Sequence, residues 1–67
     1  MKLKIEIVTG NAAFADGNLG LEISRILIEA ADLIEGHMDP DELENDLDGK
    51  PLRDFNGNRV GKITVEN

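Results

Sequence analysis

The spacing of apolar residues changes twice along this chain of 67 residues. In residues 2–9 the apolar side chains fall at every second position, and toward the end of the chain the alternation returns at Ile63 and Val65. From residue 19 onward they fall at every third or fourth position instead. Period two predicts a half-buried strand, and a period near 3.6 predicts an amphipathic helix. The strand side expected to face the core carries Leu3, Ile5 and Ile7.

The helical pattern runs from Leu19 to about Glu35. Asn18 is expected to act as the N-cap, since its side-chain oxygen can accept a free backbone N–H of the first turn. Gly36 follows the pattern and is expected to adopt a left-handed conformation there. At 100° per residue, the apolar side chains form a core face spanning an arc of about 120°. This face consists of Leu19, Ile23, Ile26, Leu27, Ala30, Leu33 and Ile34.

Two other groups of helix residues lie off this core face. Arg25 shares a flank with three acids and is spaced to pair with Glu22 or Glu29. Leu21 and Ile28 lie seven residues apart, nearly opposite the core face, and are expected to be exposed. Their exposure is either incidental or marks a contact, with a second copy of the chain or with a partner protein.

A shorter helical turn is expected to follow the main helix. Asp39 precedes a proline and stands three residues before Glu42, which is a capping-box arrangement with proline at the first helical position. Leu43 and Leu47, four residues apart, are expected to anchor this turn to the body of the protein.

The end of the chain is typical of a hairpin. Residues 52–55 and 59–66 flank the turn sequence Asn56-Gly57-Asn58. The loop at residues 10–18 is expected to place Phe14 over the edge of the core. The sequence therefore predicts one α+β domain over residues 1–67. Its elements follow one another along the chain as β-α-(short α)-β-β, and the three strands form an antiparallel sheet. The expected spatial order is first–third–second strand, with the main helix on one face of the sheet.

Charge is distributed unevenly along the chain. Eleven of its fourteen acidic residues lie in residues 16–48, with Arg25 the one base among them, and the whole chain has a formal net charge of −7. Such a field repels nucleic acid and attracts basic protein surfaces, so direct binding to DNA or RNA is not expected. The densest part is residues 39–48, called the acidic segment below. Its carboxylates are Asp39, Asp41, Glu42, Glu44, Asp46 and Asp48.

Two interpretations of the acidic segment remain open. Its carboxylates either keep a small protein soluble or occupy Lys and Arg side chains that would otherwise hold phosphates. Two partial calcium-loop patterns, starting at Glu44 and Asp54, lack ligands at the required positions. We therefore expect no metal site and no cofactor, and leave open only weak binding of divalent ions by the acidic segment.

Catalytic patterns are missing from the sequence. His37 is the single histidine, cysteine is absent, and no nucleophile stands in a recognisable setting. His37 follows the main helix, where an imidazolium is stabilised by the negative end of the helix dipole. Because no apolar run approaches 18 residues, no membrane span is expected either. The sequence predicts a non-enzymatic protein.

Three stretches of the chain carry a resemblance. They are Lys4-Ile-Glu-Ile with Asn11-Ala-Ala-Phe14, the Ile-Leu-x-x-Ala-Ala-Asp pattern at residues 26–32, and the run Leu52-Arg-Asp-Phe-Asn-Gly-Asn-Arg-Val-Gly61. With these motifs the chain resembles small uncharacterised proteins of phage and prophage genomes. The segment of residues 37–50 is longer and more acidic than that pattern leads us to expect.

The resemblance implies a context, which is a phage protein acting in the host cytoplasm by binding a host machine, as anti-CRISPR inhibitors do. The leading hypothesis is an inhibitor of a host nucleic-acid-handling defence complex, with the acidic segment on its basic surface and Leu21 and Ile28 in an apolar contact. The alternative is a small homodimeric structural or regulatory phage protein with Leu21 and Ile28 at the dimer seam. Sequestration of a nucleotide signal is a third option that the negative field disfavours.

Overall fold

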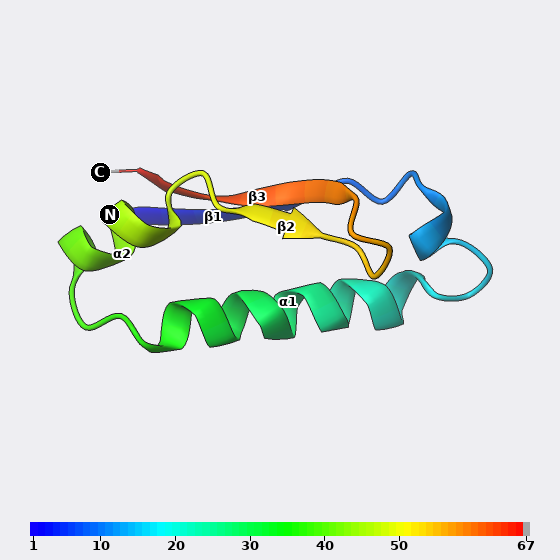
Figure 1. The fold of residues 1–67 in the computed structure, drawn as a ribbon, viewed down its shortest axis with the longest axis horizontal. Helices are drawn as coiled ribbons and strands as arrows, with labels where there is room; N and C mark the ends of the chain where they lie inside the picture. The colour runs from blue at the N-terminus through cyan, green and yellow to red at the C-terminus, as the bar shows by residue number, and fades with distance from the viewer. Residues whose placement is uncertain (67) are drawn as a thin grey trace.

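A computed structural model describes residues 1–66 of the chain. The main helix lies against one face of a three-stranded antiparallel sheet, in which the strands are ordered β1-β3-β2 (Figure 1). The expected α+β fold and strand order are confirmed. In chain order the elements are β1 (Lys2–Ile7), the 3₁₀ turn η1 (Ala12–Phe14), α1 (Leu19–Glu35), α2 (Pro40–Leu47), β2 (Pro51–Arg53) and β3 (Arg59–Glu66).

A bulge interrupts the pairing of β2 with β3. Leu52 lies opposite Gly61 and Arg53 lies opposite Arg59, so Val60 is an extra residue without a partner in β2. A bulge changes the direction of the side chains at the inserted residue. The side chain of Val60 is accordingly buried in the core, together with that of Ile63.

Gly61, next to the bulge, allows β1 to approach β3 closely. A Cβ atom on Gly61 would lie 2.8 Å from the carbonyl carbon of Glu6 and 3.1 Å from the Cα atom of Ile7. Both of these are backbone atoms, which cannot move aside as the end of a side chain can. Glycine is therefore required here for the pairing of the two strands.

The hydrophobic core lies between α1 and the sheet and extends to α2 and η1. Phe14 is buried over the edge of this core, and Ile63 and Val65 of β3 face it, as the sequence predicts. The buried apolar residues are Ala13, Phe14, Ile26, Ala30, Leu43, Leu47, Leu52, Val60, Ile63 and Val65.

Part of the predicted core is wrong. Leu3 and Ile5 of β1 are 38% and 37% exposed, and Leu27 of α1 is 43% exposed. Leu19 and Leu33 of α1 are exposed as well. The physical reason is the position of α1, which contacts η1, α2 and β2 and leaves the apolar side of the edge strand β1 incompletely covered.

Both predicted caps of α1 are also wrong. The side chain of Asn18 makes no capping hydrogen bond, although its backbone oxygen accepts from the N–H of Glu22 at 2.9 Å. Gly36 has a φ of −76°, which is right-handed backbone that any residue adopts. The helix thus begins and ends at the expected residues without the expected side-chain or left-handed caps.

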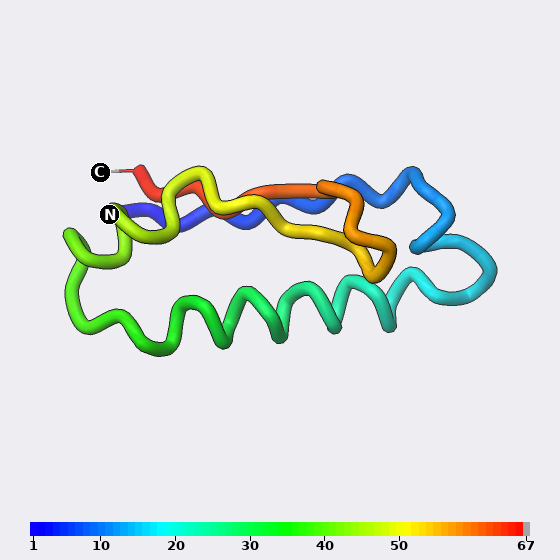
Figure 2. The backbone as a smooth tube through the Cα atoms, viewed as in Figure 1, coloured from blue at the N-terminus to red at the C-terminus, as the bar shows by residue number. Residues whose placement is uncertain are grey.

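The molecule is elongated, measuring 39 × 18 × 17 Å. β1 begins and β3 ends at the end of the molecule where α2 lies, and the β2–β3 hairpin turn and η1 lie toward the other end (Figure 2). Within residues 1–66, no helix combines the length and the apolar character needed to cross a membrane.

Candidate protein-binding surfaces

α2 holds the acidic segment in a defined conformation. The side chain of Asp39 accepts a hydrogen bond from the N–H of Glu42 at 2.9 Å, and Pro40 occupies the first helical position. Leu43 and Leu47 are both buried against the core. The predicted anchor and the Asp39 half of the predicted capping box are therefore confirmed, while no hydrogen bond from the N–H of Asp39 to the Glu42 side chain completes the box. The helix presents its carboxylates from a fixed backbone rather than from a loop.

The six carboxylates of the acidic segment have different surroundings. Besides Asp39, two of them serve the fold: Asp46 pairs with His37 at 2.9 Å, and Asp48 accepts a hydrogen bond from the N–H of Val65 at 2.9 Å. Glu44 is half-buried. The side chains of Asp41 and Glu42 are exposed and form no hydrogen bond or ion pair with any residue from 1 to 66. Asp41 and Glu42 are thus the carboxylates of α2 most available to a partner.

His37 connects the end of α1 to α2. In its imidazolium form, Nε2–H donates to Asp46 at 2.9 Å and Nδ1–H donates to the backbone oxygen of Ile34 at 3.3 Å. The hydrogen bond to Asp46 raises the pKa of His37 above its ordinary value, and partial burial opposes this rise. His37 therefore sits at the helix end, where the sequence places it, with a carboxylate partner nine residues away that the sequence did not indicate.

A possible cation-binding cluster lies at the same place. One ligand atom each from His37, Glu42 and Asp46 can be chosen so that all three lie within 4.8 Å of one another. Imidazole and carboxylate groups are ordinary ligands of divalent metals. The weak divalent-ion binding that the sequence left open falls on these three residues, while the expectation of no metal site stays a prediction.

Asp54, which starts one of the partial calcium-loop patterns, organises the hairpin turn. Its Oδ1 accepts from the backbone N–H groups of Asn56 and Asn58, each at 2.9 Å. Its Oδ2 accepts from the side-chain amides of Asn11 at 2.7 Å and Asn58 at 3.3 Å. Burial alone would raise the pKa of Asp54, but these hydrogen bonds together hold it below its ordinary value. Its oxygens are thus assigned to N–H donors.

Glu22 fastens α1 to the hairpin. The carboxylate is buried, is held by the Arg25 guanidinium, and accepts a hydrogen bond from the N–H of Phe55 at 2.8 Å. Arg25 in turn donates to Glu29 at 2.7 Å and to the backbone oxygen of Arg53 at 2.9 Å. The Arg25 hydrogen bond lowers the pKa of Glu22. Arg25 pairs with both predicted acids. Glu22 was assigned to a solvated flank of the helix, although at 100° per residue it lies about 20° from Leu33, at the edge of the predicted core face.

Leu21 and Ile28 are exposed as predicted, at 74% and 62%. The structure adds Phe55, which is 61% exposed although its backbone is held by Glu22. Leu21 and Phe55 both line a shallow hollow of ≈ 310 Å³ beside Arg25. The sequence missed Phe55 because its position next to the hairpin turn favoured a strand residue. Leu21 and Phe55 therefore form one apolar site, and Ile28 lies seven residues, about two turns, farther along α1.

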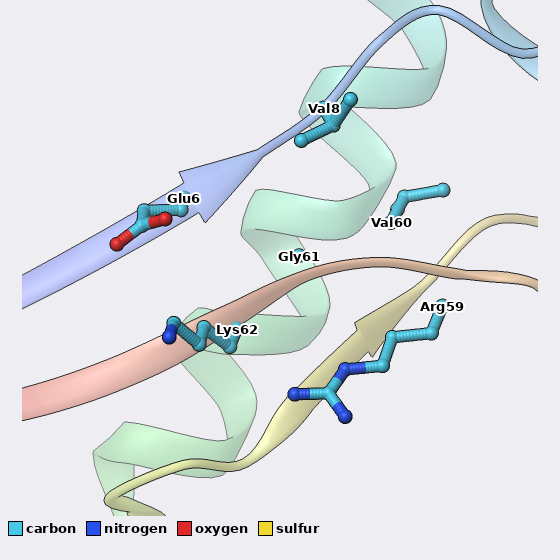
Figure 3. A pocket seen from close by; sticks show the side chains of 6 residues that line it. All are labelled: Glu6, Val8, Arg59, Val60, Gly61 and Lys62. Carbon is cyan, nitrogen blue, oxygen red and sulfur yellow. The ribbon is translucent and has the colours of Figure 1, made fainter.

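The open face of the sheet carries a second shallow hollow, of ≈ 380 Å³. Glu6 and Val8 line it from β1 and the residues that follow this strand, and Arg59 and Lys62 line it from β3 (Figure 3). Val60 and Gly61 at the bulge also line it. The acidic and basic groups at its rim are mixed, which does not favour an anionic ligand over a cationic one.

Comparisons with protein-family models, with curated proteins and with solved structures found no match to this chain.

Proposed function

We propose that this chain is a non-enzymatic protein that binds and inhibits a complex that handles nucleic acid, with its acidic surface on a basic surface of that complex. The observation that carries the proposal is that α2 is an ordered acidic helix, docked by Leu43 and Leu47, with the carboxylates of Asp41 and Glu42 exposed. Carboxylates on a rigid backbone lose less conformational entropy on binding than those of a mobile loop.

The C-terminal half of α1 also carries exposed carboxylates. Asp32 and Glu35 are exposed in the C-terminal half of α1, and this half leads directly into the linker to α2 (Figure 1). An end of the molecule with carboxylates from two helices steers a basic partner toward that end before contact. The partner is then a protein whose Lys and Arg side chains otherwise hold phosphates.

The biological setting is the one that the resemblance to phage and prophage proteins implies. In that setting the partner is a host defence complex in the host cytoplasm, and the inhibitor is of the anti-CRISPR kind. Leu21 and Ile28 contribute an apolar contact, to which the exposed ring of Phe55 is added on the strength of its shared hollow with Leu21. The alternative, a homodimer joined along Leu21 and Ile28, rests on the same exposure of these two side chains.

A salt-dependent pull-down tests the proposal. Tagged protein is mixed with bacterial host lysate at low and high salt, and the captured proteins are identified by mass spectrometry and tested for binding to labelled nucleic acid. We expect capture at low salt of a nucleic-acid-binding complex that is released at high salt, because interactions between exposed charges are screened. Adding free protein should then reduce the binding of labelled nucleic acid to that complex.

Matched variants separate the site from the overall charge. Asp41→Asn with Glu42→Gln changes the net charge by the same amount as Thr9→Lys with Asn56→Lys, and all four positions are exposed. The first pair should weaken capture by about tenfold, since it removes two charge contacts, and the second pair should leave capture nearly unchanged. Equal capture by both double variants, or captured proteins that bind no nucleic acid, would contradict the proposal.

A further inference from the structure

The outer edge of β1 has unpaired backbone groups in a regular pattern. β1 is an outermost strand of the sheet, and no segment of residues 1–66 pairs with its other side. The N–H of Val8 donates to the oxygen of Val60 at 2.7 Å, so the even-numbered residues direct their backbone groups toward β3. In an antiparallel pair these directions alternate along the strand. The N–H and C=O groups of Leu3, Ile5 and Ile7 therefore point away from the sheet.

The apolar side of this edge is also incompletely covered. Leu3 and Ile5 lie opposite Val65 and Ile63 of β3 and share their helix-facing side, yet they are exposed where their partners are buried. Helix α1 is fastened toward β2 by the contacts of Glu22 and Arg25 with the hairpin, which draws it away from β1.

Leu27 adds an exposed aliphatic side chain from the helix. At 100° per residue it lies on the flank of α1 opposite Glu22 and Arg25, which is the flank nearer β1, and its side chain is exposed. One strip of the molecule thus combines an unpaired strand edge with exposed aliphatic side chains from two elements. An edge of this kind is a template for pairing with another strand.

We propose that a second copy of this chain pairs with this edge, β1 against β1 in antiparallel orientation, to form a continuous six-stranded sheet. The two-fold axis passes beside Ile5, which lies opposite Ile5 of the other copy, and Leu3 lies opposite Ile7. These are the residues whose backbone groups point outward, so each facing pair exchanges two hydrogen bonds.

The charges of β1 select this register and this occupant. With Ile5 opposite its own copy, Lys4 of each chain, which also pairs with Glu66 of its own chain at 2.9 Å, faces Glu6 of the other chain, which gives two opposite-charge pairs on the open face of the sheet. Sliding the strands by two residues in one direction pairs Lys2 with Glu6 twice but places Lys4 opposite Lys4, and sliding them in the other direction places Glu6 opposite Glu6, so only the first register has opposite-charge pairs and no like-charge pair. Opposite charges directly across a strand pair are stabilising and like charges are destabilising. The sequence Lys4-Ile5-Glu6 is therefore self-complementary in the antiparallel sense.

This interface differs from the dimer seam considered for α1. It leaves Leu21 and Ile28 uncovered and available to a different partner, and it places the two copies of α1 on the same face of the joined sheet. The exposed Leu27 of each copy then borders the seam, where the apolar side chains of both β1 strands meet.

Charge reversal with rescue tests the pairing. The mass in solution is measured by analytical ultracentrifugation over a wide range of concentrations, with the 7.3 kDa chain expected to double in mass. Lys4→Glu and Glu6→Lys singly each create two like-charge pairs and should raise the dimer dissociation constant by about tenfold. The double variant Lys4→Glu with Glu6→Lys leaves the Lys4–Glu66 pair within each chain broken but restores opposite charges across the seam, and it should restore the dimer.

The result that overturns the proposal is a wild-type chain that stays monomeric at all concentrations, which would leave the edge to a strand of another protein. Dimers that survive both single reversals, or that are lost in Leu21→Glu with Ile28→Glu and kept in Lys4→Glu, would also overturn it. If a reversal unfolds the monomer, amide hydrogen exchange of the wild type decides. The amides of Leu3, Ile5 and Ile7 should be slow to exchange at high concentration and fast on dilution, and fast exchange at both would exclude the pairing.

Discussion

Among single residues, two buried carboxylates hold the hairpin in place. Asp54 gathers four N–H donors from the turn and from the loop before α1, and Glu22 accepts one N–H from the hairpin and carries the Arg25 pair. A buried carboxylate is tolerated only where its lone pairs are satisfied, and both of these are. Asp54 and Glu22 therefore stabilise the fold, although the acidic composition of the chain does not distinguish them from its solvated carboxylates.

Replacing Asp54 with alanine is expected to lower the melting temperature by about 5 °C or more. The substitution leaves four donors without their acceptor, two of them backbone N–H groups. Asn56→Ala is the matched control in the same turn, because the side chain of Asn56 is exposed. Thermal unfolding followed by circular dichroism compares the two variants, and equal melting temperatures would show that the turn does not depend on Asp54.

At the scale of the elements, α2 depends on its attachment to the core. It has eight residues, and isolated helices this short are not stable in water. Leu43 and Leu47 supply the attachment, and His37 adds a polar link from the end of α1. The display of Asp41 and Glu42 on a fixed backbone therefore depends on two leucines that face the other way.

Leu47→Ala is expected to lower the free energy of unfolding by about 2–3 kcal/mol, since it removes a buried side chain and leaves a cavity. Asn45→Ala, an exposed change on the same helix, should stay within about 0.5 kcal/mol of the wild type. Urea unfolding measures both. A Leu47→Ala variant as stable as Asn45→Ala would mean that α2 is not packed on the core in solution.

The elements themselves were predictable from the sequence, because apolar spacing reports which face of a strand or helix is buried. The spacing does not report which neighbour covers that face. Leu3, Ile5 and Leu27 follow the core pattern and are nevertheless exposed, because α1 is positioned by the long-range contacts of Glu22 and Arg25 with the hairpin.

The acidic segment was also only partly predictable from the sequence. The position of the acidic segment, its cap and its leucine anchors follow from local patterns. The partners that occupy Asp46 and Asp48 are His37 and the N–H of Val65, which are nine and seventeen residues away. Local spacing therefore could not separate these carboxylates from the exposed Asp41 and Glu42.

For the whole molecule, stability is expected to be greatest between about pH 4.5 and pH 6.5. The pKa of His37 is raised above 6.5 by Asp46, so this pair stabilises the fold below that pH and its contribution is lost as the pH rises through the raised value. The pKa values of Glu22 and Asp54 are lowered from 4.5 and 3.8. The contributions of Glu22 and Asp54 to stability are therefore fully present above their ordinary pKa values and are lost as the pH falls through their lowered pKa values.

Urea unfolding across a pH series checks this profile. Asp46→Asn should reduce the decline on the alkaline side, because the imidazolium loses its main charged partner while Glu42 and the backbone oxygen of Ile34 remain, and should leave the acid side unchanged. An alkaline decline of the same size in wild type and Asp46→Asn would show that another group causes it.

The pairing of the first strand with the last one governs when the fold can form. Lys2 lies opposite Glu66, and about fifty residues separate the end of β1 from the start of β3. The sheet therefore has a high contact order and forms slowly. During synthesis α1 leaves the ribosome long before β3. Until β3 has emerged, β1 has no strand to pair with on either edge. A translation stop before residue 59 removes the central strand. Such a truncation leaves β1 and β2 with nothing to join them, so it abolishes the sheet instead of shortening it.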